Sequence, residues 1–150
     1  MSHETTKLAL TNLRDSFLDH TAKRNLQFSL SDLAGACGVV SFLAFRMLKR
    51  MGYRPVFHMN DAHCFITVEG YWVDLTLTQF APDADEVFFR NHPYRLEKRG
   101  VSPHKRGRTA TTERAIRKLF TKWDDYGNPF KQPLPKLPKT IRLTKAKTGL

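Results

Sequence analysis

The residues of this chain that are best suited to chemistry are Cys37, His63 and Asp74. A cysteine attacks as its thiolate, and the free N–H groups at the start of a helix lower the pKa of a thiol placed there. Gly35-Ala36-Cys37-Gly38 puts the sulfur at the start of an apolar segment, between small residues that leave room for a substrate. The pattern predicts a nucleophile at Cys37, with the backbone N–H groups of Cys37 and Gly38 forming an oxyanion hole.

A predicted hairpin decides whether His63 and Asp74 can meet. The segments on either side of Glu69-Gly70 alternate in polarity, and these two residues are typical of a tight turn. A turn centred on them places Phe65 opposite Asp74, so that His63 and Asp74 project from one face with Cα atoms about 7–8 Å apart. A shift of one residue would turn Asp74 to the opposite face and separate it from His63.

Hydrophobic periodicity predicts the elements that position these residues. Apolar residues at helical spacing indicate helices over 4–22 and 37–51, and Gly52 is expected to end the second. Residues 81–109 read as irregular. Three strands are expected between the second helix and this irregular segment: Arg54–Met59, His63–Glu69 and Tyr71–Thr78. The predicted class is α+β, with the Cys37 helix packed on a small antiparallel sheet.

The positive charge of the chain lies in its last third. Residues 1–97 contain 10 Lys and Arg against 11 Asp and Glu, whereas residues 98–150 contain 15 against 3. We therefore expect a core over 1–97 and a basic extension over 98–150. The extension holds a helix over about 111–124, capped by Thr111 or Thr112, and then a tail rich in Pro and Lys.

Such a concentration of charge indicates an acidic partner: nucleic acid, an anionic membrane face or an acidic protein. The candidate partner patch consists of Lys105, Arg106, Arg108, Arg114, Arg117 and Lys118. On the alternative interpretation the chain is a small basic nucleic-acid-binding protein in which Cys37 is structural. No recognised nucleic-acid-binding signature accompanies the charge, so this interpretation ranks second.

A family resemblance rests on two segments, GACGVVSFLAFRMLKRMGYRPVF and HCFITVEGYWVDLTLTQF. They resemble the core of the transglutaminase-like cysteine enzymes, which belong to the papain-like superfamily. In that family a Gly-x-Cys opens a helix, a glycine ends it, a His begins a strand, and an Asp follows Trp-Val on the next strand. The matching positions here are Cys37, Gly52, His63 and Trp72-Val73-Asp74, within about residues 33–80.

The resemblance implies a papain-like fold and a Cys37–His63–Asp74 triad that attacks amide carbonyls through a thioester. His63 would act as base and then acid, and Asp74 would hold its tautomer. The chain departs from the family at Gly38, where an aromatic or another distinctive group usually follows the cysteine. The interval from Cys37 to His63 is 26 residues, which leaves no room for calcium-binding insertions. These features favour a protease or glutamine deamidase, while an amine acceptor would make the enzyme a transferase.

Further site residues follow from their positions near the predicted triad. Gln27, upstream of Cys37, is the candidate side-chain donor to the oxyanion, and Trp72 and Gln79 are candidate substrate contacts. The expected substrate is a protein or peptide amide. No cofactor or metal is expected.

Other histidines and cysteines suggest a competing zinc site from Cys37, His58, His63 and Cys64. This set lacks the C-x-x-C or H-x3-H spacing of structural zinc sites, and Cys64 should face away from His63 on its strand. Asp61 is poorly placed to orient His63. The sequence suggests no partner for the remaining histidines: His3, His20, His92 and His104.

Hydropathy gives an expectation for the cellular location of the protein. No run approaches the roughly 20 apolar residues that span a bilayer, and the first 25 residues lack the continuous apolar stretch of a secretory signal. We therefore expect a cytoplasmic protein without a membrane span.

Overall fold

A computed structural model describes residues 2–24, 36–95, 102–123, 127–131 and 133–137. They form helices and strands in an α+β arrangement around a five-stranded antiparallel sheet of order β4-β3-β2-β1-β5. The elements are α1 (His3–Arg24), α2 (Cys37–Arg50), β1 (Val56–Met59), β2 (Cys64–Val68), β3 (Tyr71–Asp74), a 3₁₀ turn (Leu77–Gln79), β4 (Phe88–Arg90), β5 (Arg108–Ala110) and α3 (Glu113–Leu119). The predicted α+β class is confirmed.

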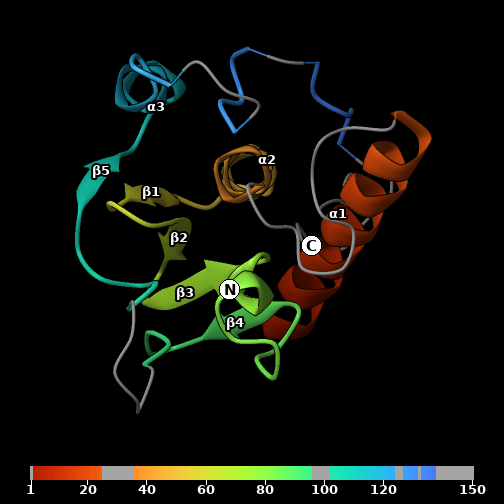
Figure 1. The fold of residues 1–150 in the computed structure, drawn as a ribbon. Coiled ribbons are helices and arrows are strands. Elements are labelled where there is room, and N and C mark those ends of the chain that lie inside the picture. The colour runs from red at the N-terminus through yellow and green to blue at the C-terminus, as the bar shows by residue number, and fades with distance from the viewer. Residues whose placement is uncertain (1, 25–35, 96–101, 124–126, 132, 138–150) are drawn as a thin grey trace.

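Helix α2 lies at the centre of the molecule, with the sheet on one side and α1 and α3 beside it (Figure 1). Eleven of its 14 residues are buried, because apolar side chains cover most of its circumference. It packs chiefly on β2, and next on α1 and β1. Gly52 ends the helix with φ +92°, and the Tyr53 N–H reaches back to the Leu48 carbonyl. This is the glycine-terminated helix end that the sequence predicts.

The hairpin of β2 and β3 has the predicted register. Ile66 pairs with Val73, and Val68 pairs with Tyr71. Glu69 and Gly70 both have positive φ, at 49° and 82°, as a two-residue turn with the right-handed strand twist requires. Continued by one pair, this register places Phe65 opposite Asp74.

Several bounds differ from the predictions. Strand β3 ends at Asp74 instead of Thr78, and β4 and β5 both lie within 81–109 or at its end, where no strand was expected. Helix α3 is shorter than 111–124; Thr112 caps it, and its hydroxyl accepts the Ala115 N–H at 3.1 Å. Because β5 pairs with β1, the described start of the basic extension is built into the sheet. Within the described residues, no helix has the length and apolarity needed to cross a membrane.

Candidate functional site

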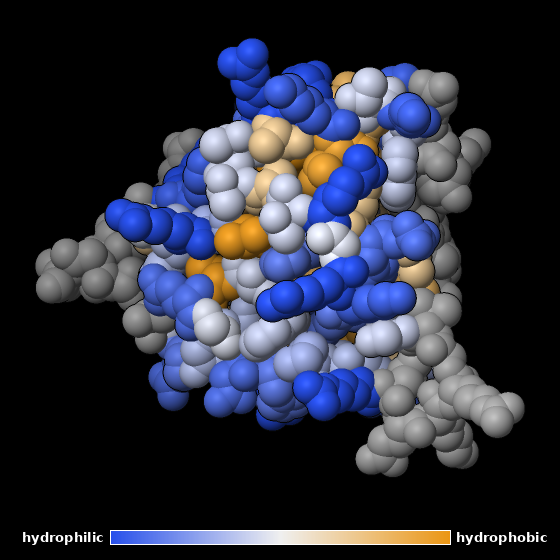
Figure 2. Space-filling view, turned by 90° about the vertical axis from the view of Figure 1, so that its left-hand side faces the viewer, coloured by the Kyte–Doolittle hydropathy of each residue, from blue (hydrophilic) through white to orange (hydrophobic). Residues whose placement is uncertain are grey.

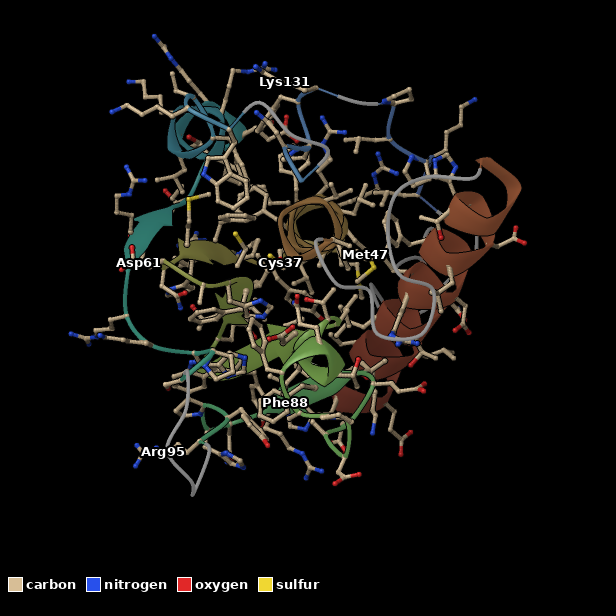
Figure 3. The ribbon with its side chains drawn as sticks, viewed as in Figure 1. Cys37, Met47, Asp61, Phe88, Arg95 and Lys131 are labelled. Atoms are coloured by element: carbon tan, nitrogen blue, oxygen red, sulfur yellow. The ribbon has the colours of Figure 1, made fainter. Side chains whose placement is uncertain are left out.

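Cys37 is the first residue of α2, and it is 8% exposed. The preceding residue, Ala36, offers no side-chain cap, so the first N–H groups of the helix stay free to stabilise negative charge. The His63 ring and the Cys64 thiol are neighbours of Cys37, and both act to lower the pKa of the Cys37 thiol. Ser41 of the same helix donates to the Cys64 carbonyl at 3.1 Å, which holds the start of α2 against β2. Figure 3 shows Cys37 between α2 and the sheet.

His63 and Asp74 are joined as the hairpin register predicts. His63 Nε2 lies 2.6 Å from Asp74 Oδ2, and both side chains are fully enclosed. The other carboxylate oxygen, Oδ1, accepts the Thr76 N–H at 3.0 Å. The Asn60 side chain accepts the His63 N–H at 2.8 Å. Because Nε2 is engaged by the carboxylate, Nδ1 is the nitrogen left to exchange a proton with Cys37.

His104 is a third member of this cluster, and the sequence suggested no partner for it. Its Nε2 lies 2.8 Å from the same Oδ2 of Asp74, and its Nδ1 accepts the Tyr94 N–H at 2.8 Å. Since Nδ1 accepts, the neutral ring carries its hydrogen on Nε2 and donates to Asp74. The 29 residues between Asp74 and His104 hold no local pattern that would bring the two together.

The ligand atoms of His63, Asp74 and His104 lie within 4.8 Å of one another, as they would in a metal site. A metal-bound histidine normally donates its second ring N–H to an acceptor. His104 instead receives the Tyr94 N–H at that second nitrogen, so metal at Nε2 would require a deprotonated imidazolate. The two histidines are therefore better placed to hydrogen-bond the Asp74 carboxylate than to bind a metal ion together with it. The competing zinc set does not assemble, because His58 is bound to Thr67 at 2.7 Å and stacked on Phe65.

The site favours a charged His63. Burial alone would lower the pKa of His63, but the charge of Asp74, its hydrogen bond and the neighbouring Cys37 thiolate raise this pKa to about 10. Burial acts to raise the pKa of Asp74, yet the charge on His63 and hydrogen bonds from both imidazoles hold that pKa well below its usual range. Asp74 therefore stays ionised and holds a proton on His63.

The two cysteines are pushed in opposite directions. A hydrogen bond from Cys64 lowers the pKa of Cys37; burial opposes this effect, and the His63 hydrogen bond and charge reinforce it. The hydrogen bond to Cys37, burial and nearby negative charge raise the pKa of Cys64. The sequence analysis gave Cys64 no role at the site, and the structure makes it a neighbour that lowers the pKa of the candidate nucleophile.

The other predicted site residues divide into three groups. The Gln79 amide lies 3.3 Å from His63 Nδ1 and therefore belongs to the site. Trp72 is half-buried on β3 opposite Thr67, and no described hydrogen bond or ring contact joins it to Cys37 or His63. Gln27 lies outside the described residues.

The residues of the predicted basic patch lie in two places. Lys105, Arg106 and Arg108 line a groove beside the β1–β2 turn. The others lie exposed on α3: Arg114, Arg117 and Lys118.

Comparisons with protein-family models, with curated proteins and with solved structures found no match to this chain. The case for a function therefore rests on the arrangement of these side chains.

The lowered pKa of His58 leads us to expect that the protein loses stability in acid. Burial, and secondarily the charge of His104, lower the pKa of His58 from 6.5 to about 4. The unfolded chain then binds a proton below pH 6.5 that the folded chain does not bind until about pH 4, so stability falls over that interval as pH falls. Because the ring is only half-buried, we expect a loss of about 1–2 kcal/mol in the free energy of unfolding.

Urea unfolding at pH 7 and pH 4.5 measures this loss. His58→Phe keeps the stacking on Phe65 and should reduce the acid loss, whereas His92→Gln, at an exposed ring, should leave it at the wild-type value. An equal acid loss in His58→Phe would assign the effect to another group.

Proposed function

We propose that this protein is a cysteine-dependent amide hydrolase or acyl transferase, with Cys37 as nucleophile, His63 as acid and base, and Asp74 as its orienting carboxylate. One observation carries the proposal. His63 is hydrogen-bonded to the Asp74 carboxylate in a buried site, and Cys37, at the start of α2, is close enough to His63 for each to shift the pKa of the other. The charges match, because the site lowers the pKa of the thiol and raises that of the imidazole. This is the nucleophile–base–orienter arrangement of thiol acyl-transfer enzymes.

The reaction follows from these positions. The Cys37 thiolate attacks the amide carbonyl carbon, and the N–H groups at the start of α2 stabilise the resulting oxyanion. His63 gives its Nδ1 proton to the departing amine as the C–N bond breaks, which leaves a thioester on Cys37. His63 then takes a proton from water, whose oxygen attacks the thioester and releases the carboxylic acid and the thiolate. An amine in place of water would complete a transfer.

Gln79 is suited to steady the ring through both steps. Its amide lies 3.3 Å from His63 Nδ1 and 3.3 Å from the Thr76 hydroxyl. The amide nitrogen can donate to the neutral ring, and the amide turned over can accept from the imidazolium. We therefore place Gln79 beside the proton that moves, and not at a remote substrate contact.

The test is alkylation of the folded protein with limiting iodoacetamide from pH 4 to 9, mapped to each cysteine by mass spectrometry. Cys37 should react with a midpoint far below the ordinary thiol value of about 8.5. Cys64 is the internal control and should stay unmodified, because its pKa is raised. In His63→Ala the Cys37 midpoint should rise toward that of an ordinary thiol.

Release of amine from a peptide-amide library then measures turnover, with Cys37→Ser as the inactive control. A Cys37 that is inert, or that titrates as an ordinary thiol with and without His63, would overturn the proposal.

A further inference from the structure

A groove of about 890 Å³ opens on the side of the molecule that carries β5 and α3. One wall is the turn between β1 and β2, with Asp61 and Ala62, and the other is the segment from Lys105 to Arg108. Its volume is within the range of ligand-binding pockets in proteins. Figure 2 shows this side of the molecule, where hydrophilic residues surround a small hydrophobic area. Figure 3 shows Asp61 at the edge of the sheet and Cys37 in the interior.

The groove lies beside the candidate site. Ala62, in its wall, directly precedes His63. Met59, also in its wall, pairs with Cys64, a neighbour of Cys37 that lowers the pKa of the Cys37 thiol.

Trp123, which also lines the groove, connects it to the start of α2. The ring of Trp123 lies 5.0 Å from that of Phe120, and Phe120 packs so closely on Gly38 that a Cβ there would be 2.9 Å from it. The groove is therefore linked to the residues next to both members of the pair, through Ala62 to His63 and through Trp123 and Phe120 to Gly38.

Asn60 joins the two walls into one unit. Its side-chain oxygen accepts the N–H groups of Ala62 and His63 at 2.9 and 2.8 Å. Its side-chain nitrogen donates to the carbonyls of Pro103 and Lys105, each at 3.0 Å. The basic wall is thus held in a fixed position relative to His63, as a specificity surface must be.

The charge of the groove is strongly positive. Among the described residues that line it, Lys105, Arg106 and Arg108 are exposed, and Asp61 supplies the one carboxylate. In the part of the chain that the structure describes, no ion pair engages these three cations. They are free to meet carboxylates of another molecule.

We propose that this groove binds an acidic segment of a polypeptide substrate, next to the amide that is attacked at Cys37. The inference rests on the proposed function and adds the class of substrate. Asp61 favours a polypeptide over nucleic acid, because a carboxylate can accept backbone N–H groups but repels phosphates. Trp123 and Met59 add an apolar surface for side chains between the acidic ones.

Three peptidyl chloroacetamides of one backbone, with two Glu, two Gln or two Lys residues beside the reactive group, test the proposal. The rate of Cys37 alkylation is followed by intact mass and divided by the rate with iodoacetamide. We expect the Glu probe to react about tenfold faster than the Gln probe at 50 mM NaCl, and the preference to shrink at 500 mM NaCl. Arg106→Glu should abolish the preference, measured as the ratio of each probe rate to the iodoacetamide rate of the same variant. Lys7→Glu, with the same charge change at an exposed site on α1, should keep it.

The outcomes separate the two proposals. Ordinary thiol behaviour toward iodoacetamide would overturn the proposed function. A reactive Cys37 with equal rates for the three probes, or with a Glu preference that survives Arg106→Glu, would overturn the acidic-substrate proposal alone. Protection of Cys37 by a 20-nucleotide single-stranded DNA at lower concentration than the Glu peptide would also overturn it, and would assign the groove to nucleic acid.

Discussion

Replacing Asp74 with alanine is expected to abolish the reactivity of Cys37 at neutral pH and to destabilise the fold by about 3–5 kcal/mol. The Asp74 carboxylate accepts hydrogen bonds from His63, His104 and the Thr76 N–H, and its side chain is fully enclosed. Without it, two buried imidazoles lose their acceptor, and nothing offsets the effect of burial on the pKa of His63. The pKa of His63 should then fall, the ring should lose its proton, and the Cys37 thiolate should lose its counter-ion.

Asp74→Asn separates charge from packing. The amide has the same size, and its oxygen can accept from both imidazoles, but the negative charge is lost and the NH2 group then faces the Thr76 N–H that Oδ1 accepts. We expect an intermediate loss of stability and a fall in turnover of up to about 10⁴-fold, as when the orienting carboxylate of a serine triad is replaced by an amide.

Urea unfolding and the alkylation profile of Cys37, each at several pH values, measure the two effects of these substitutions. Asp61→Asn is the matched control. Asp61 is exposed in the adjoining turn, and its substitution removes the same charge. An unchanged alkylation midpoint in Asp74→Asn would contradict the role given to this carboxylate.

The sequence predicted the parts of the site that depend on local signals. Glu69-Gly70 specifies a two-residue turn, and that turn sets the register that brings His63 and Asp74 together. Likewise, the small residues before an apolar run predicted that α2 begins at Cys37. Both predictions need only neighbours within one element or one hairpin.

The parts that the sequence missed depend on contacts between distant segments. Strands β4 and β5 are three residues each, too short for alternation to stand out, and they exist because β3 and β1 offer them an edge. The part played by His104 was missed for the same reason. Its ring is held by the Tyr94 N–H and by Asp74 Oδ2, which come from other segments of the chain.

The charge boundary near residue 97 does not separate the described structure. His104 comes from the basic extension and contacts Asp74, and β5 completes the sheet beside β1. The segment that brings the positive charge therefore also supplies a hydrogen bond to the proposed orienting carboxylate. Substrate recognition and the geometry of His63 are expected to respond together to changes in this segment.

Gly107→Ala tests that coupling, and a loss of about 3 kcal/mol in the free energy of unfolding is expected. A Cβ at this position would lie 2.2 Å from the Met59 carbonyl oxygen and 2.7 Å from the Asn60 Cα. Both are backbone atoms, so no side-chain rotation can relieve the overlap, and the segment must move away from β1. His104 and Lys105 should move with it, because they lie three and two positions before Gly107. The contact of His104 with Asp74 should weaken, and the alkylation midpoint of Cys37 should rise.

Urea unfolding and the alkylation profile of Gly107→Ala give both readouts, and the probe series adds the expected loss of Glu preference. Ser102→Ala, at an exposed position of the same segment, is the control and should behave as wild type. A destabilised Gly107→Ala protein that keeps the wild-type Cys37 midpoint and Glu preference would show that this segment stabilises the sheet without influencing the site. Changes in all three readouts are expected instead, because Asn60 binds the backbone of this segment and of His63 with one side chain.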